Sequence, residues 1–595
     1  MTKSLMIQTT AKSLGGFEAV ASYARKIGAT HLHVATLAPR SRWQWERDLT
    51  DPYPNWGMSH IHVLKLWVPA CLRPWLPWQE AEKYLAGLEE RGRILEKYGL
   101  KLSLGMNEPF WLPEEVYQAH PHWRGPRIDH PRRARHPYFS PCIDQPEVLA
   151  LYREAMGEIC KLLPLDTVIF KSNDAGAGIC WSTGLYTGQN GPAACAHRDM
   201  KTRILGFLSA FQEGARDVGK ELVLDFNANL EYKENEHRLD DLWPFLPPGV
   251  FLNGRDNQGR PGKRVVRALT ETNTSGVSPV REIPDVHRLA MKLCDAWQSD
   301  SRRIVFGLSS LEGPEARLLE KFLQGPPGDD VSAMMLVRET ASELAGAERG
   351  GILSDLWYRI AQGFSDIEHL HLPFSEYGTV HQRWLTRPLV VSPARLTPEE
   401  RDYYRKYQFQ ALSEEQANDL MDIQGLTFIR GFSGTFLATQ SLEKAAGHFQ
   451  QAVEKAERLL GDPAAPYSTE LEALKIRLKA GICILRNAIH AAKFQEILDS
   501  VNPEQPPILS GNWPTPGDPR TASLQNLIRG EADNTQALID LIRGREQSVL
   551  LLTPPGEAED IFVIGADIVE RLEQKIRIMY AHLPDIQEIL ETANI

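Results

Sequence analysis

The residues with the clearest chemical potential are an amide and a carboxyl next to each other, Asn173 and Asp174. They follow a short apolar run, Thr167–Phe170, of the kind that forms a buried parallel strand. A carboxyl beside an aromatic wall can have its pKa raised enough to act as a general acid, while an amide holds a neighbouring group of the ligand. The alternative is an Asn-Asp turn that caps the next segment. We interpret the pair as the centre of a polar pocket walled by Trp181 and Tyr186.

Polar and aromatic side chains also follow other predicted strands. Carboxyl and amide groups hydrogen-bond to sugar hydroxyls, and aromatic rings pack against the C–H faces of sugars, so this mixture is typical of a sugar site. The alternative is the ordinary polar chemistry of loops. We predict that the residues that bind substrate, besides Trp181 and Tyr186, are Glu108, Asp225, Asn227, Asn253, Arg255, Asp256, Asp355 and Trp357.

Hydrolysis of a glycosidic bond normally uses two carboxyl groups, one on each side of the bond that breaks. Spacing along the chain says nothing about distance across a folded site, so several partners for Asp174 stay open. These partners are Glu108, Asp225, Asp256, Glu282 and Asp355. The other solution is substrate assistance, in which the 2-acetamido oxygen of the sugar is the nucleophile and one residue polarises that amide.

A scaffold that gathers several strand ends is predicted by the pattern of the first 390 residues. Eight short apolar runs indicate strands: Ser4–Thr9, His31–Leu37, Lys101–Met106, Thr167–Phe170, Glu221–Phe226, Gly249–Leu252, Arg303–Leu308 and Gly351–Leu356. Segments with helical periodicity lie between most of them. This alternation predicts the α/β class and a (β/α)8 TIM barrel over residues 1–390, with the site at the C-terminal ends of the strands.

The pattern changes after about Pro398, where strand signals nearly vanish. Residues 391–595 are therefore predicted to form a mainly helical C-terminal domain, with a proline-rich loop at Asn502–Pro519. The segments with helical period are Thr397–Gln410, Ser413–Ile423, Ser441–Leu460, Ser468–Ile497, Thr521–Arg543 and Ala558–Leu590.

Bulk properties exclude several classes of protein. The chain has 595 residues and a formal net charge of −11, which favours more than one domain and argues against a general nucleic-acid binder. No stretch approaches the ~18 consecutive apolar residues of a membrane span. The beginning of the sequence lacks the apolar segment of a signal peptide, so we expect a cytoplasmic protein, with export as the alternative. The seven cysteines form no CxxC pair, which argues against a disulfide framework or a zinc site.

Two further groups of residues have weaker signals. The loop His120–Tyr138 is rich in arginine and proline, which suits either recognition of a carboxylate or sulfate or a solvated loop paired with acidic neighbours. His31 and His33 alternate on one predicted strand and are a weak indication of a metal site, because no third ligand lies nearby. We predict that the protein uses neither a metal nor an organic cofactor.

In outline, a long barrel followed by a helical domain resembles the α-glucuronidases. The pair Asn173-Asp174 is similar to the paired residues of substrate-assisted β-N-acetylhexosaminidases, which carry Asp-Glu, Asp-Asp or Asn-Glu at the end of the fourth barrel strand. This resemblance implies an exo-acting glycoside hydrolase, with Asp174 as the general acid and Asn173 as the residue that orients the 2-acetamido group. The alternatives are an α-glucuronidase-like hydrolase of uronic acids and a non-catalytic carbohydrate-binding barrel. We expect a carbohydrate substrate and neither a nucleic-acid nor a membrane partner; homodimer formation stays open.

Overall fold

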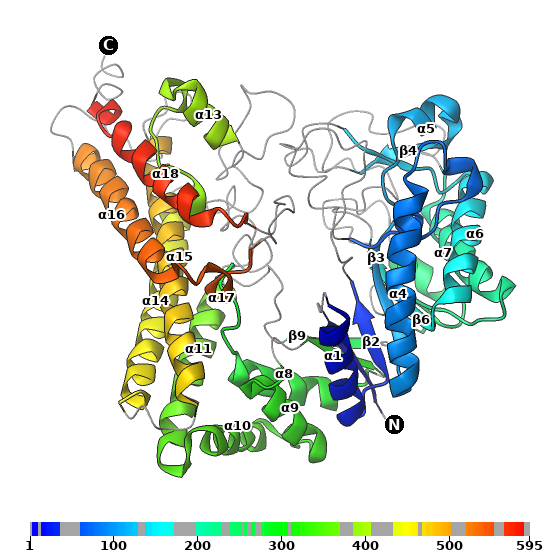
Figure 1. Ribbon diagram of the computed structural model, residues 1–595, viewed down its shortest axis with the longest axis horizontal. Coiled ribbons are helices and arrows are strands. Elements are labelled where there is room, and N and C mark those ends of the chain that lie inside the picture. Colours follow the sequence, from blue (N-terminus) through cyan, green and yellow to red (C-terminus); the bar gives the residue numbers. More distant parts are fainter. Residues whose placement is uncertain are drawn as a thin grey trace. The chain divides into compact units, whose positions relative to one another are not determined.

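The computed structural model describes residues 3–9, 13–35, 60–128, 137–171, 198–227, 239–252, 255–258, 263–267, 277, 279–301, 303–307, 311–368, 385–405, 432–461, 467–500, 519–552 and 564–587. The chain divides into two compact units (Figure 1). Unit 1 comprises Met1–Ala268, Met291–Leu311 and Phe322–Gly328, and unit 2 comprises Leu269–Ala290, Glu312–Lys321 and Asp329–Ile595. The domain boundary expected near residue 390 stays a prediction.

Unit 1 is built on an eight-stranded sheet of parallel strands. The strands are β1 (Ser4–Thr9), β2 (His31–Val34), β3 (Lys101–Asn107), β6 (Leu165–Lys171), β7 (Val223–Asn227), β8 (Val250–Leu252), β9 (Lys263–Arg267) and β10 (Arg303–Gly307). Their order is β8-β7-β6-β3-β2-β1-β10-β9, so the first strand pairs with the last and the order is the cyclic order of a barrel. Among the described residues no pairing joins the edge strands β8 and β9. The predicted α/β class is confirmed, and a complete eight-stranded ring stays a prediction.

A single hydrogen bond shows how strongly this sheet curls. Arg303 on β10 donates from Nη1 to Oγ1 of Thr167 on β6 over 3.3 Å. These strands are four positions apart in the sheet, which in a flat sheet means a separation of about 19 Å. The side chains therefore meet across the concave face of the sheet. The C-terminal ends of the strands consequently lie around a common centre, as the barrel prediction requires.

Unit 1 also contains helices, and their ends follow local sequence signals. They are α1 (Leu14–Lys26), α3 (Val63–Leu66), α4 (Trp78–Tyr98), α5 (Glu114–Ala119), α6 (Pro146–Leu162) and α7 (Met200–Asp217). Asp199 caps α7 by accepting from the backbone N–H groups of Lys201 and Thr202. Helices α6 and α7 approach closely at Gly214, where a Cβ atom would lie 2.3 Å from the carbonyl oxygen of Arg153.

Short elements complete unit 1: the 3₁₀ helices Ala70–Leu72, Pro121–Trp123 and Leu239–Phe245, and the hairpin β4 (Arg124–Arg127) and β5 (Phe139–Pro141).

Seven of the eight predicted strands occur within about two residues of the expected positions, except that β2 ends three residues early. The eighth prediction, Gly351–Leu356, is wrong, because these residues lie inside the helix α11 (Ala347–Glu368). Leu353, Leu356, Trp357, Ile360 and Phe364 are buried on one face of α11, and their spacing is helical. The strand that completes the set is β9, whose sequence KRVVR is too charged to stand out as a buried strand.

Unit 2 is helical in its described residues. After α10 (Asp330–Ala345) and α11 come α13 (Pro398–Arg405), α14 (Phe432–Leu459), α15 (Ser468–Ser500), α16 (Pro519–Ile542), α17 (Glu546–Val549) and α18 (Ile568–Ala581). Helices α14, α15 and α16 run side by side as long rods (Figure 1). Gly363 lets α11 approach α14, because a Cβ atom there would lie 2.6 Å from the ring of Phe449. The helical character expected after residue 391 is found in the described residues; Ser413–Ile423 and most of the proline-rich loop lie outside them.

Helices α8 (Val286–Gln298) and α9 (Pro314–Gln324) contain residues of both units. Among the helices of the described residues, none is both long enough and apolar enough to cross a membrane.

Candidate functional site

The register of unit 1 brings three polar positions together at the C-terminal ends of neighbouring strands. Asn107 on β3 pairs with Lys171 on β6, and Lys171 pairs with Asn227 on β7. Partners in register on parallel strands share one face of the sheet. The chain continues from Lys171 directly toward Asn173 and Asp174. This edge of the sheet is therefore the candidate site, although Asn173, Asp174, Trp181, Tyr186 and Asn253 themselves lie outside the described residues.

A short segment from another part of the chain extends this edge. Ile61 forms a parallel bridge with Met106, and the backbone N–H of Asn107 donates to the Ile61 carbonyl over 3.2 Å. The segment takes the place beside β3 that β2 leaves when it ends at Val34. It brings His62 next to Asn107. The pattern of the sequence did not point to His62. The alternation His60-Ile61-His62 before an apolar turn is the signal that could have identified it.

The ring of His62 is held in one orientation and one tautomer. Its Nδ1 bonds to the carbonyl oxygen of Asn107, and because a carbonyl can only accept, Nδ1 carries the hydrogen. Phe110 stacks on the ring with centroids 3.4 Å apart. Burial lowers the pKa of His62 well below its ordinary value, and the charge of the buried Lys65 lowers it further. The imidazole is therefore neutral, with a lone pair on Nε2.

Glu108 follows Asn107 and is turned into the protein. Its side chain accepts from the Val63 N–H over 2.6 Å and from the Tyr152 hydroxyl over 3.2 Å. Burial raises the pKa of Glu108 to about 8, although these donors and the Phe110 N–H act in the opposite direction. Glu108 is thus a neutral carboxylic acid at pH 7, placed one residue from the strand-end row. Its predicted contact with substrate stays a prediction.

The other described candidates have different surroundings. Asp225 is buried within β7, and its carboxylate acts electrostatically on Arg303, so it belongs to the polar cluster on the concave face. Arg255 makes two backbone hydrogen bonds with Leu252, the last residue of β8, and its guanidinium lies 5.4 Å from the ring of Trp243. Asp256 accepts from the N–H of Gln258 over 2.9 Å in the turn that follows. Asp256 therefore shows the turn chemistry named above as the alternative to a sugar contact.

Asp355 and Trp357 were expected at the end of a barrel strand, and this placement is wrong. Both lie on α11 in unit 2. Asp355 is exposed and pairs with Lys455 on α14 at 3.1 Å, while Trp357 is completely buried. An apolar run of six residues does not distinguish a buried strand from the buried face of a helix, which is why the sequence misled here.

His31, His33 and Arg124, from the two groups with weaker signals, are engaged by protein groups. His31 bonds to Asp166 at 2.8 Å near the N-terminal ends of the strands, and His33 bonds to Ser103 at 2.9 Å. His31 lies at the N-terminal end of the sheet, opposite to the candidate site. At that end of a barrel, polar clusters contribute to stability. Arg124 in the arginine-rich loop forms an ion pair with Glu114 and lies against two aromatic rings. Arg124 therefore pairs with an acidic neighbour, which agrees with the interpretation of the segment as a loop paired with acidic residues.

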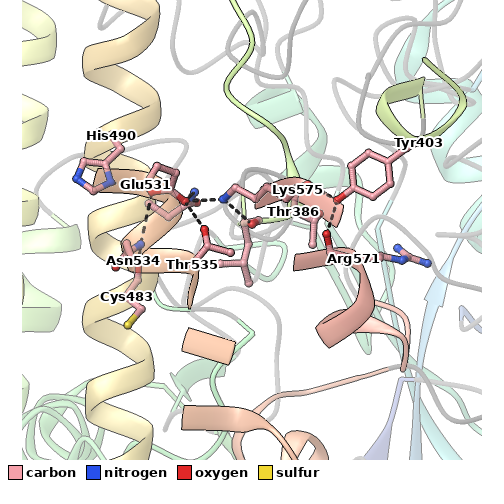
Figure 2. A network of polar contacts seen from close by, with 11 residues as sticks. Thr386, Tyr403, Cys483, His490, Glu531, Asn534, Thr535, Arg571 and Lys575 are labelled. Atoms are coloured by element: carbon pink, nitrogen blue, oxygen red, sulfur yellow. Dashed lines mark hydrogen bonds and ion pairs between the residues drawn. The ribbon is translucent and has the colours of Figure 1, made fainter. Parts of the chain in front are cut away.

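Unit 2 contains a second group of buried charges that the sequence did not reveal (Figure 2). Lys575 on α18 is completely buried, and its ammonium donates to Glu531 on α16 over 2.5 Å and to the carbonyl of Leu385 over 2.9 Å. The Glu531 carboxylate also accepts from Asn487, at 2.7 Å, and bonds to His490, at 2.7 Å, both on α15. These contacts join three helices and the segment that begins at Leu385. We call this group the Glu531 network.

The structure resembles a solved glycoside hydrolase in fold. No protein-family model matches the sequence, and the comparison with curated proteins finds no match either. A GH138 enzyme that targets pectin rhamnogalacturonan II matches with a TM-score of 0.51 and 8% identity, covering 100% of this chain and 68% of that chain. GH36 α-galactosidase AgaA from Geobacillus stearothermophilus matches with a TM-score of 0.33 and 12% identity, covering 54% of this chain and 41% of its own. The first likeness extends the shared fold over both units of this chain.

Proposed function

We propose that this protein is an exo-acting glycoside hydrolase whose reaction takes place at the C-terminal ends of the strands in unit 1. The observation that carries the proposal is the row of Asn107, Lys171 and Asn227 at the edge of a sheet with barrel order. In barrels of parallel strands, catalysis occurs at this edge. The fold likeness to a GH138 enzyme over the whole chain supports the same class of reaction.

In the finer form of the proposal, the substrate carries a terminal N-acetylgalactosamine or N-acetylglucosamine in β linkage. The carbonyl oxygen of the 2-acetamido group attacks the anomeric carbon while Asp174 gives its proton to the leaving oxygen. Water then opens the cyclic intermediate, and Asp174 recovers a proton from that water, so the configuration is retained. Asn173 holds the acetamido group in position, and Trp181 and Tyr186 supply the aromatic wall. This assignment rests on the sequence of the loop that follows Lys171.

A second candidate is the hydrolysis of a uronic acid linkage. It is favoured by the GH138 neighbour, because the target in that protein's description, rhamnogalacturonan, contains galacturonate by name. The carboxylate of such a substrate needs a planar cationic partner, which arginine provides. Arg255 in the turn after β8 and the arginines of residues 124–135 are the candidates for that role.

The experiment is a hydrolysis screen followed by substitution of the general acid. The panel contains p-nitrophenyl β-N-acetylgalactosaminide, β-N-acetylglucosaminide and glucuronide, and oligosaccharides of rhamnogalacturonan II. Asp174→Asn should lower the rate on natural leaving groups by about 10²–10⁴-fold, with a smaller loss on activated aryl glycosides that need little protonation. Asp533→Asn, an exposed carboxyl on α16, is the matched control.

Two results would decide against parts of the proposal. Binding of sugars without turnover of any member of the panel would make the protein a non-catalytic carbohydrate-binding barrel. A thiazoline mimic of the cyclic intermediate should bind far more tightly than the free sugar if the acetamido group is the nucleophile. Equal affinity for the two would exclude that mechanism and leave the uronic acid hydrolase.

A further inference from the structure

The Nε2 atom of His62 is buried and has no hydrogen-bond partner among the described residues. The whole residue is inaccessible to solvent. An unpaired buried polar atom has lost its water without gaining a protein partner, so it needs an explanation, and a bound ligand is one. Because Nδ1 carries the hydrogen, Nε2 presents a lone pair and acts as an acceptor only.

A second unpaired atom lies on the neighbouring residue. Nδ2 of Asn107 is also buried without a partner among the residues that the structure describes. Unlike Nε2 of His62, it is a donor. The two residues are linked directly, because the carbonyl of Asn107 holds the His62 ring.

The two residues occupy the same face of the sheet. Ile61 is in register with Met106, so one step further along the chain His62 stands beside Asn107. Alternation along a strand places both positions on the face opposite to that of the buried Ile61 and Met106. Asn107 is the first member of the row that continues to Lys171 and Asn227. The acceptor and the donor therefore border the candidate site.

The pairing of one acceptor with one donor selects the chemistry of the ligand. A hydroxyl group both donates and accepts, so its chemistry matches an acceptor such as Nε2 of His62 and a donor such as Nδ2 of Asn107. An anion is unsuitable, because the lone pair of Nε2 would repel it and offers it no hydrogen. A metal cation would face the amide hydrogens of Asn107 and the buried ammonium of Lys65, and the described residues contain no group of three metal-binding side chains.

We propose that His62 and Asn107 form a hydroxyl-binding pair that positions the terminal sugar in the strand-end site. The inference rests on the proposed function for the identity of the ligand as a sugar. His62 accepts the hydrogen of one ring hydroxyl, and Asn107 donates to the oxygen of that hydroxyl or of its neighbour. No bond to the sugar breaks at this pair, so both are positioning residues.

The test measures hydrolysis by His62→Ala and Asn107→Ala with the substrate that the panel identifies and with its monodeoxy analogues. Each variant should lower kcat/KM for the complete sugar by about 10- to 100-fold. For the analogue that lacks the bound hydroxyl, wild type and variant should differ less than twofold. A merely structural role would lower the rate on all analogues equally, and that result would overturn the proposal.

A conservative variant and a control substitution sharpen this test. His62→Gln carries an amide oxygen near the position of Nε2 and should restore part of the lost rate. His122→Gln changes an exposed histidine of the same unit and should leave both rate and Tm unchanged. Equal losses for His62→Gln and His62→Ala, together with a lowered Tm, would assign His62 to the core.

A binding measurement separates this inference from the proposed function. The probes are N-acetylglucosamine, N-acetylgalactosamine and glucuronate, added to protein with ¹⁵N-labelled histidine rings and followed by NMR. The Nε2 signal that His62→Gln removes should shift when a sugar saturates the site. A bound sugar that leaves this signal unchanged would overturn the hydroxyl pair. Activity lost in Asp174→Asn but not in His62→Ala would leave the hydrolase standing and the pair refuted.

Discussion

Two glutamates, one in each unit, are both almost completely buried, and they have opposite protonation. Glu108 in unit 1 is 1% exposed, and burial raises its pKa to about 8. Glu531 in unit 2 is fully buried as well, yet its pKa is lowered to about 2. Burial acts on Glu531 in the same direction as on Glu108, but Lys575 and His490 together outweigh it. The partner, not the depth, decides the charge of a buried carboxyl.

The difference separates a region that can act on a ligand from one that holds helices together. The donors to Glu108 are neutral groups, Val63 N–H and Tyr152 hydroxyl, and the neighbouring strand end leaves polar atoms of His62 and Asn107 unpaired among the described residues. In the Glu531 network, both the carboxylate and the ammonium of Lys575 have several protein partners. A buried charge pair with satisfied groups joins chain segments, whereas a buried carboxyl whose donors are all neutral keeps its proton.

The largest effect is expected from changing the pH around Glu108. Its pKa is raised from 4.5 to about 8, so the folded state binds this proton more tightly than the unfolded state. The stability from the neutral carboxyl is complete below about pH 4.5 and is lost as the pH rises through about 8, a change of roughly 5 kcal/mol at most. Glu108→Gln, which stays neutral, should lack this dependence. The measurement is the unfolding free energy of unit 1 by hydrogen exchange from pH 5 to 9.

Infrared difference spectroscopy provides a direct readout of the same group. Wild type minus Glu108→Gln should show the C=O stretch of a protonated carboxyl at pH 7 and lose it above pH 9. Tyr152→Phe removes one donor to Glu108 and should move that loss to still higher pH. If the band is missing at pH 7, Glu108 is ionised and the contrast with Glu531 disappears.

The next effect is the loss of the counter-charge in unit 2. Lys575→Met leaves the Glu531 carboxylate buried without its ammonium, which should destabilise unit 2 by about 3–5 kcal/mol. The double variant Lys575→Met with Glu531→Leu removes both charges and should lose less. Urea unfolding, with hydrogen exchange of α16 amides, measures both. Lys493→Met, which breaks an exposed pair with Glu443, should cost less than about 1 kcal/mol; a similar cost for Lys575→Met would contradict the role of burial.

The smallest effect concerns a pair close to solvent. Burial lowers the pKa of His582, but hydrogen bonds to Asp585 and Glu400, at 2.7 and 3.1 Å, raise it overall above 6.5. Its contribution to stability is complete below about pH 6.5 and disappears as the pH rises through the higher folded value. His582→Gln should lower stability by less than about 1 kcal/mol at pH 6 and by nothing measurable at pH 9. Thermal unfolding at the two pH values checks this, and an equal loss at both would show that the imidazole charge contributes nothing.

Much of unit 1 could be predicted because its strands are local features. The runs at Ser4–Thr9, Lys101–Met106 and Arg303–Leu308 are apolar over the length of a strand and are flanked by turns, and each is a strand. The run at Gly351–Leu356 has the same local appearance, but it continues into residues whose helical spacing buries one face of α11. Strand β9 was not predicted, because only two β-branched residues lie between its charged residues and the segment does not look apolar.

The sequence by itself determined where most strands and helices form and which strand ends carry polar residues, because spacing along the chain sets both. Only the tertiary structure decided what those residues meet. The contact of Lys575 with Glu531 joins residues 44 positions apart, and the neutral state of Glu108 depends on Val63 and Tyr152, each 44 or 45 positions away. Charge and pairing depend on distance in space, and distance along the chain carries no information about it once the chain has folded.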